Sequence, residues 1–237
     1  MVQLLSQPGS GPNGSAVTVS NCANPNQWDA NPTKTGTGTT LNFDNAHLLH
    51  ELPTVHKFHY ATVSSTAYAQ WKASVTATAN SLNRIYFYFT AFPSVQLRLL
   101  SLLTGSNVNA ASMVMTTGGK LRIQNSAGTN SGTTVGSIPL NAWWRVELDV
   151  LGISSGLGNI GLRYYSGVNL ESTTPDETQV NAVGANVIGN INDVRLGSNV
   201  ATTQTVALDY WAADMRWSDT VLDPPDKYGW GIPLVAA

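Results

Sequence analysis

The stretch from Ala142 to Val150 constrains the fold of this chain more than any other. Trp144 and Val146 fall on one side of an extended chain, while Arg145 and Glu147 fall on the other. Alternation with a period of two is typical of a strand that has one face in a core and the other toward water or a groove. The stretch therefore predicts a central strand of a sheet sandwich.

Short strands are predicted along most of the chain, and no segment shows a sustained helical period. The predicted strands cover residues 39–43, 57–63, 68–75, 84–92, 95–103, 110–115, 120–124, 142–151, 159–165, 193–196 and 205–217. Many short strands without helices indicate an all-β sandwich or barrel.

Two local features refine this prediction. Gly118-Gly119 lies between two short predicted strands, which is typical of a tight hairpin. In 205–217 the apolar side changes parity near Ala212 and Ala213. A β-bulge has this effect, because one extra residue reverses the faces of the side chains that follow it.

The charge of the chain limits its partners. Charged residues make up 11% of the chain and the formal net charge is −2, whereas a typical domain has about 25% charged residues. No basic field is present to attract nucleic acid. Such a surface indicates either burial in an assembly or a neutral, lectin-like exterior.

The cysteine count and the N-terminus favour a soluble protein. Cys22 is the single cysteine, which excludes an intramolecular disulfide framework and a cysteine-based metal site. Residues 1–5 have no basic region or long apolar run, so we expect no secretory leader. No window approaches the roughly 18 apolar residues of a membrane span.

We expect one sandwich domain over residues 1–220, with an extended N-terminal arm over 1–37. Residues 221–237 form a C-terminal tail that we expect to pack on the domain or on a neighbouring molecule. The predicted assembly contacts in this tail are Tyr228, Trp230 and Leu234.

Six stretches resemble the concanavalin A-like, laminin G-like jelly-roll domains. They are residues 14–18 (Gly-Ser-Ala-Val-Thr), 41–44 (Leu-Asn-Phe-Asp), 84–89 (Arg-Ile-Tyr-Phe-Tyr-Phe), 119–123 (Gly-Lys-Leu-Arg-Ile), 138–148 (Ile-Pro-Leu-Asn-Ala-Trp-Trp-Arg-Val-Glu-Leu) and 208–219 (Leu-Asp-Tyr-Trp-Ala-Ala-Asp-Met-Arg-Trp-Ser-Asp). The chain departs from the family pattern at 47–53 (His-Leu-Leu-His-Glu-Leu-Pro). The resemblance implies an antiparallel jelly-roll β-sandwich.

The pattern is most similar to the variant found in virion proteins of phages that infect actinobacteria. This implies a non-catalytic virion surface protein, either a capsid decoration or a minor tail component, that forms a homo-oligomer. The implied partners are other copies of the chain, virion proteins and a cell-surface glycan. The alternatives are a lectin-like carbohydrate-binding module unconnected to a virion, and a glycan hydrolase or lyase.

The carboxylates of Glu147 and Asp149 point the same way from a strand, as the catalytic pair of a retaining glycosidase must. Glycosidases on this fold carry a third acidic residue in the same motif, and Gly152 occupies that position. We therefore expect no catalysis, and we expect Arg145 to pair with Glu147.

Two candidate binding sites remain. Aromatic platforms with hydrogen-bonding neighbours bind sugars, and the candidate glycan-binding residues are Trp143, Arg145, Glu147 and Trp211. All four histidines fall within 13 residues, and the candidate metal ligands are His47, His50, His56 and His59. We expect no cofactor, with structural zinc at these histidines or calcium at Asp44, Asp176, Glu177 or Asp193 as the alternative.

Overall fold

The computed structural model describes residues 3–6, 11–22, 28–49, 52–151, 159–181 and 189–220. These residues form two antiparallel sheets and one short 3-10 helix, η2 (Gly167–Asn169). No helix in these ranges is long and apolar enough to cross a membrane.

Sheet A has eight strands and sheet B has seven. The strands of sheet A are β1 (Gln3–Ser6), β3 (Thr40–Asp44), β4 (Val55–Tyr60), β6 (Ser81–Phe89), β11 (Trp143–Leu151), β12 (Asn159–Ser166), β13 (Glu177–Asn181) and β15 (Leu208–Ser218). Those of sheet B are β2 (Thr33–Thr35), β5 (Ser65–Trp71), β7 (Leu97–Thr104), β8 (Asn109–Met115), β9 (Leu121–Gln124), β10 (Asn130–Thr133) and β14 (Ile191–Thr202).

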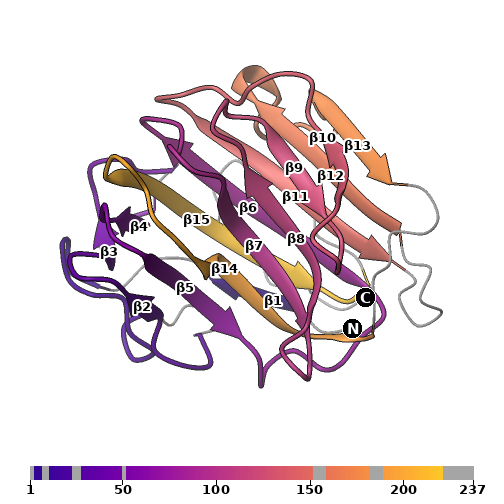
Figure 1. Cartoon of the computed structure of the whole chain (residues 1–237), viewed down its shortest axis with the longest axis horizontal. Coiled ribbons are helices and arrows are strands. Elements are labelled where there is room, and N and C mark those ends of the chain that lie inside the picture. Colours follow the sequence, from indigo (N-terminus) through magenta and orange to yellow (C-terminus); the bar gives the residue numbers. More distant parts are fainter. Residues whose placement is uncertain are drawn as a thin grey trace.

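The chain passes repeatedly between the two layers, which Figure 1 shows one behind the other. Sheet A has the order β13-β12-β11-β6-β15-β4-β3, and sheet B has the order β10-β9-β8-β7-β14-β5-β2. Strands that are far apart in sequence, such as β6 and β15, are therefore neighbours. This arrangement confirms the predicted jelly-roll β-sandwich.

β11 is an interior strand of sheet A, as its alternation predicts. It pairs with β6 on one side and β12 on the other. Trp144, Val146, Leu148 and Val150 all belong to the core between the sheets. Because this parity is fixed by burial, the polar residues between them must lie on the outer face of sheet A.

The predicted bulge in β15 is confirmed. The register of β15 against β6 shifts between Ala213 and Arg216, and Asp214 has a positive φ of 45°. Beyond the bulge Met215 and Trp217 belong to the core. The extra residue therefore keeps the apolar side chains of both halves of β15 in the core.

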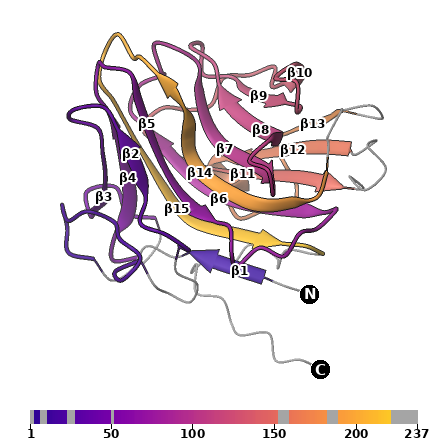
Figure 2. The same cartoon turned by 60° about the horizontal axis from the view of Figure 1, so that its bottom comes forward.

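The N-terminal arm contributes strands to both sheets. β1 pairs with the C-terminal half of β15 (Figure 2), and β2 forms the edge of sheet B beside β5. Between these two strands, Ala16 makes an isolated bridge to Asn42.

His56 is a buried titratable residue in the core. It is 1% exposed. Its ring centroid lies 6.0 Å from that of Trp28 and 5.7 Å from that of Phe43. Its Nε2 atom has no hydrogen-bond partner among the described residues. Burial lowers the pKa of His56 from 6.5 to about 4, because a charged ring would lose its hydration.

We predict that His56 makes the fold sensitive to acid. Between pH 6.5 and about 4 the unfolded chain binds a proton here and the folded chain does not. The free energy of unfolding should therefore fall as the pH falls through this range, by about 3 kcal/mol. His56→Phe should remove this part of the pH dependence in denaturant titrations. His59→Gln, on the outer face, is the control, and equal slopes for His56→Phe and the wild type would contradict the prediction.

Candidate functional site

The outer face of sheet A holds a buried network of arginines and carboxylates. Glu147 is its centre: it accepts hydrogen bonds from Arg84 Nε at 2.9 Å, Arg163 Nη1 at 3.1 Å and the Tyr165 hydroxyl at 3.0 Å. Arg145 Nε lies 3.9 Å from the same carboxylate. The predicted pairing of Arg145 with Glu147 is thus present, within a larger network.

One segment of the chain covers the aromatic end of this face. Leu49 and Leu52 pack with Trp211 in a hydrophobic cluster, and Trp143 lies against it. Trp143 Nε1 donates a hydrogen bond to the carbonyl oxygen of Leu48 at 3.0 Å. The apolar outer surface of β6 and β15 is therefore covered by the protein's own chain.

A second segment covers the charged end. Ser172 accepts a hydrogen bond at its carbonyl oxygen from Arg145 Nη2 at 2.6 Å, and Glu171 accepts one from the Tyr86 hydroxyl at 2.7 Å. Arg145 is 0% exposed and Trp211 is 3% exposed. The four predicted glycan-binding residues share one face, but three of them are buried and do not form an open sugar platform.

The pKa values of the two carboxylates on β11 shift in opposite directions. Burial alone would raise the pKa of Glu147, but the guanidinium groups of Arg84 and Arg145 hold it below its ordinary value. Burial raises the pKa of Asp149 to about 6, against the opposing effect of Arg163. Asp149 Oδ2 forms an ion pair with Arg163 Nη2, whereas Asp149 Oδ1 is buried without a hydrogen-bond partner among the described residues, so only one oxygen of the ionised carboxylate is satisfied.

The predicted metal ligands do not converge. His56 points into the core, whereas His59 Nδ1 lies 2.6 Å from Asp209 Oδ1 on the outer face. The ring centroids of His47 and Trp211 are 4.0 Å apart. His50 lies outside the described residues. In the part of the chain that the structure describes, no three His, Cys, Asp or Glu side chains gather as a metal ion would require.

The candidate calcium ligands bind groups of the protein. Asp176 accepts hydrogen bonds from Ser166 and Asn169, Glu177 accepts one from the backbone of Val135, and Asp193 binds Arg195. The predicted assembly contacts Tyr228, Trp230 and Leu234 lie outside the described residues, so self-association stays a prediction.

The two sheets differ in charge. The strands of sheet B carry Lys34, Arg98, Arg122 and Arg195, and Asp193 is their single carboxylate. The strands of sheet A carry five cationic residues and six carboxylates, namely Lys57, Arg84, Arg145, Arg163 and Arg216 with Asp44, Glu147, Asp149, Glu177, Asp209 and Asp214. Sheet B is therefore cationic, whereas sheet A has nearly balanced charges.

Two of the cations on sheet B are held by amide oxygens. Arg98 Nη1 donates to Asn199 Oδ1 at 3.4 Å, and Arg122 Nη1 donates to Gln96 Oε1 at 3.3 Å. No carboxylate of the described residues forms an ion pair with Arg98 or Arg122. A neutral amide fixes a guanidinium without cancelling its charge, so both remain able to bind an anion.

A small open pocket of about 70 Å³ lies on this face. It is lined by Gln96, Arg98, Val114, Gln124, Ser198, Val200 and Thr202. Burial lowers the pKa of Arg98, although an arginine remains charged at any ordinary pH. The pocket therefore presents a partly desolvated positive charge beside several amide and hydroxyl groups.

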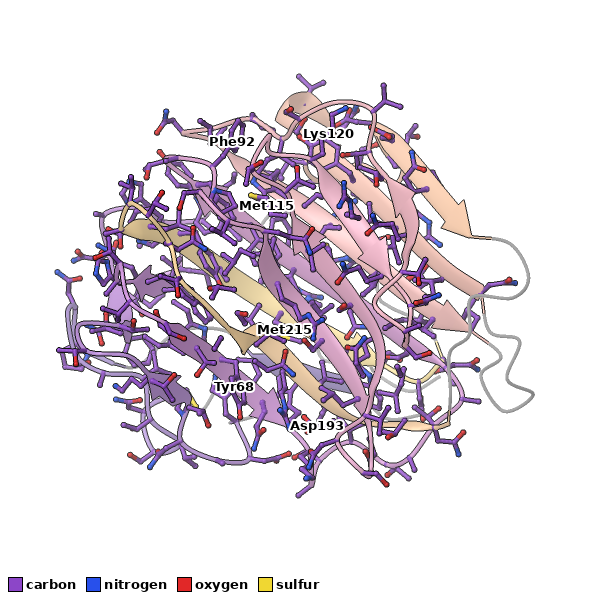
Figure 3. All side chains as sticks on the ribbon, in the orientation of Figure 1. Tyr68, Phe92, Met115, Lys120, Asp193 and Met215 are labelled. Carbon is purple, nitrogen blue, oxygen red and sulfur yellow. The ribbon has the colours of Figure 1, made fainter. Side chains whose placement is uncertain are left out.

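Tyr68 and Asp193 lie on the neighbouring strands β5 and β14 of the same sheet (Figure 3). Arg195 connects them: its Nη2 lies 2.6 Å from Asp193 Oδ2, and its Cζ lies 4.9 Å from the centroid of the Tyr68 ring. Tyr68 is half-buried, whereas Asp193 is fully buried. The pair Asp193–Arg195 is a fixed, neutral support for the tyrosine ring.

Sequence reasoning missed this face because its cations are far apart in the chain. A usable signal was present: Arg98 and Arg122 interrupt apolar strands, and no acidic residue stands in either strand. Cross-strand pairing brings them together, since Arg98 lies opposite Val114 and Val114 lies opposite Arg122.

No family model and no curated protein matches the sequence. The fold is similar to that of an endo-β-1,4-glucuronan lyase from the fungus Trichoderma reesei, at a TM-score of 0.63 and 11% identity over 94% of this chain and 98% of that one. It is also similar to a PL-14 alginate lyase from Aplysia kurodai, at 0.58 and 11% identity over 91% and 98%. The alginate lyase Aly36B gives 0.56 and 10% identity over 94% and 98%.

These neighbours confirm the jelly-roll part of the resemblance, and at such low identity they show the fold alone. They contradict the predictions of a virion surface protein and of a protein without enzymatic activity, since all three are polysaccharide lyases and none is a virion protein. The physical reason is that the motifs behind the resemblance lie largely in core strands. Such residues specify a sandwich, and a sandwich hosts many functions.

We predict that Asp149 destabilises the fold at neutral pH. Its pKa is raised in the folded state from 3.8 to about 6, so its contribution to stability is present below pH 3.8 and is lost as the pH rises through about 6. Asp149→Asn should raise the free energy of unfolding near neutral pH by about 1–3 kcal/mol, and this gain should shrink in acid.

Glu147→Gln is the matched control for this prediction. The pKa of Glu147 is lowered in the folded state, so removing its charge should destabilise the protein at neutral pH. Thermal unfolding across a pH series measures both variants. A loss of stability at neutral pH in Asp149→Asn would contradict the assignment.

Proposed function

We propose that the protein is a polysaccharide lyase that cleaves an acidic glycan on the outer face of sheet B. The observation that carries the proposal is the amide-held Arg98, which lines an open pocket with no carboxylate partner among the described residues. The names of the structural neighbours, glucuronan lyase and alginate lyase, support the same class of reaction.

The pocket suits the carboxylate of a sugar acid. A guanidinium binds a carboxylate through two parallel hydrogen bonds, and the partial burial of Arg98 strengthens that attraction. The neighbouring amides of Gln96 and Gln124 supply donors and acceptors for hydroxyl groups of the ring. A neutral sugar would leave the charge of Arg98 unpaired, so the pocket favours an acidic one.

Neutralising this carboxylate is what an elimination reaction needs. The carbon next to the carboxylate loses its proton to a base, a carbon–carbon double bond forms, and the bond to the glycosidic oxygen breaks. The departing oxygen then takes a proton. Negative charge develops on the carboxylate as the proton leaves, and a fixed cation at that position lowers the barrier.

Tyr68 is the candidate for moving the proton, because the other titratable groups on this sheet are unsuitable. Apart from the cationic residues, Tyr68 and Asp193 are the titratable groups on the strands of sheet B. Asp193 is fully buried and bound to Arg195, so it cannot reach a substrate. Tyr68 lies opposite Gly197, so no side chain projects from that position, and the Arg195 guanidinium supports the ring from the neighbouring strand.

We predict that the purified chain releases unsaturated products from alginate or glucuronan, measured by their ultraviolet absorbance. Arg98→Gln should lower kcat/KM by about a hundredfold, because it removes the charge that stabilises the developing anion. Lys120→Gln, an exposed cation in the turn before β9, is the control and should leave the rate unchanged. A wild-type chain that forms no unsaturated product from any acidic polysaccharide would overturn the proposal.

We predict a different effect for Tyr68→Phe. The variant keeps the ring but loses the hydroxyl, so kcat should fall by about 10²- to 10⁴-fold while KM stays close to the wild-type value. Steady-state kinetics on the same polymer measures both constants. Full activity in Tyr68→Phe would remove this residue from the mechanism and leave the role of Arg98 to be judged separately.

A further inference from the structure

We propose that the outer face of sheet B binds an extended oligosaccharide with several acid groups rather than a single sugar acid. This inference rests on the proposed function, because it concerns the ligand of the same face. It comes from a third cation, Lys72, which lies beyond the pocket directly after β5.

Lys72 is anchored in the same way as Arg98 and Arg122. Its Nζ donates to Asn107 Oδ1 at 3.4 Å, and the same oxygen accepts a hydrogen bond from Arg195 Nη2 at 3.0 Å. No carboxylate of the described residues forms an ion pair with Lys72. Three cations of this face are therefore held by the amide oxygens of Asn107, Asn199 and Gln96.

Strand pairing places the polar contacts around Asn107 beside those around Asn199. Arg195 lies directly opposite Ser101 on the neighbouring strand. Ser101 donates from its hydroxyl to Asn199 Oδ1 at 2.8 Å, and Asn199 is also the anchor of Arg98. We call the set Lys72, Asn107, Arg195, Ser101, Asn199, Arg98, Gln96 and Arg122 the amide-anchored track.

The centre of this track carries small, uncharged side chains. Ser101 and Ser112 are paired across β7 and β8 and are both fully buried. The hydroxyl of Ser112 has no hydrogen-bond partner among the described residues. Arg122 on β9 and Lys72 after β5 therefore lie on either side of two small, uncharged side chains.

The strand order sets the length that this ligand must have. Arg122 on β9 and Arg98 on β7 are two inter-strand steps apart, which is about 10 Å. Lys72 at the end of β5 is two further steps away, so the track spans at least about 19 Å. One sugar residue cannot contact all three cations, whereas an extended acidic chain can place a carboxylate near each.

The experiment is a calorimetric binding series with size-graded oligouronates, from the disaccharide upward, in the Tyr68→Phe variant so that no cleavage interferes. Affinity should rise with length until the ligand spans the track. Adding Lys72→Gln should weaken the longest ligand by about tenfold and leave the disaccharide unchanged. Adding Arg98→Gln should weaken every length. Lys34 is an exposed cation on the edge strand β2 and serves as the control. Lys34→Gln should change the affinity neither for the longest ligand nor for the disaccharide.

The outcomes separate the two proposals. Equal affinity for short and long ligands, or an equal effect of Lys72→Gln on all lengths, would overturn the track even if the wild-type chain cleaves polymer. Affinity that rises with ligand length, and that Lys72→Gln lowers for the longest ligands alone, would support the track. This holds even if the wild-type chain yields no unsaturated product. Circular dichroism and thermal unfolding establish that each variant keeps the wild-type fold.

Discussion

A layer of stacked aromatic rings between the two sheets holds this structure together. The Tyr210 ring lies parallel to Phe58 and Phe89, with centroids 4.7 Å away in both cases, and Phe89 stacks on Trp144. These four residues come from β15, β4, β6 and β11, so one layer ties together strands that are distant in sequence. Burying such large rings dominates the energetics of a core, and it fixes which side of each strand faces outward.

The outer faces of the two sheets use charge in opposite ways. On sheet A, arginines meet carboxylates, as with Arg84 and Glu147, and the chain's own segments cover the result. Such a network adds order and leaves little charge for a ligand. On sheet B, Arg98 meets the amide of Asn199, which positions the cation without neutralising it. Buried pairing on one face and unneutralised cations on the other are the basis for assigning function to sheet B.

The sequence predicted the interior strands well, because a strand with one buried face alternates between apolar and polar residues. β11 and the bulged β15 are examples. It missed β1, β2, β10 and β13, which are short strands at sheet edges or, for β1, outside the main strand path. Their residues, such as Thr-Lys-Thr in β2 and Asn-Ser-Gly-Thr in β10, have no apolar period. Such strands form because a neighbouring strand offers unpaired backbone groups. The local sequence does not indicate which segments will find such a neighbour.

The sequence alone determined the all-β class, the inward residues of the long strands and the position of the bulge, because each depends on local alternation. Only the tertiary structure decided which polar residues meet. It buried Arg145 and Glu147 under covering segments, and brought Lys72, Arg98 and Arg122 onto one open surface. The physical reason is that strand order and covering loops set charge neighbours across the sheet, over sequence separations that a local pattern cannot represent.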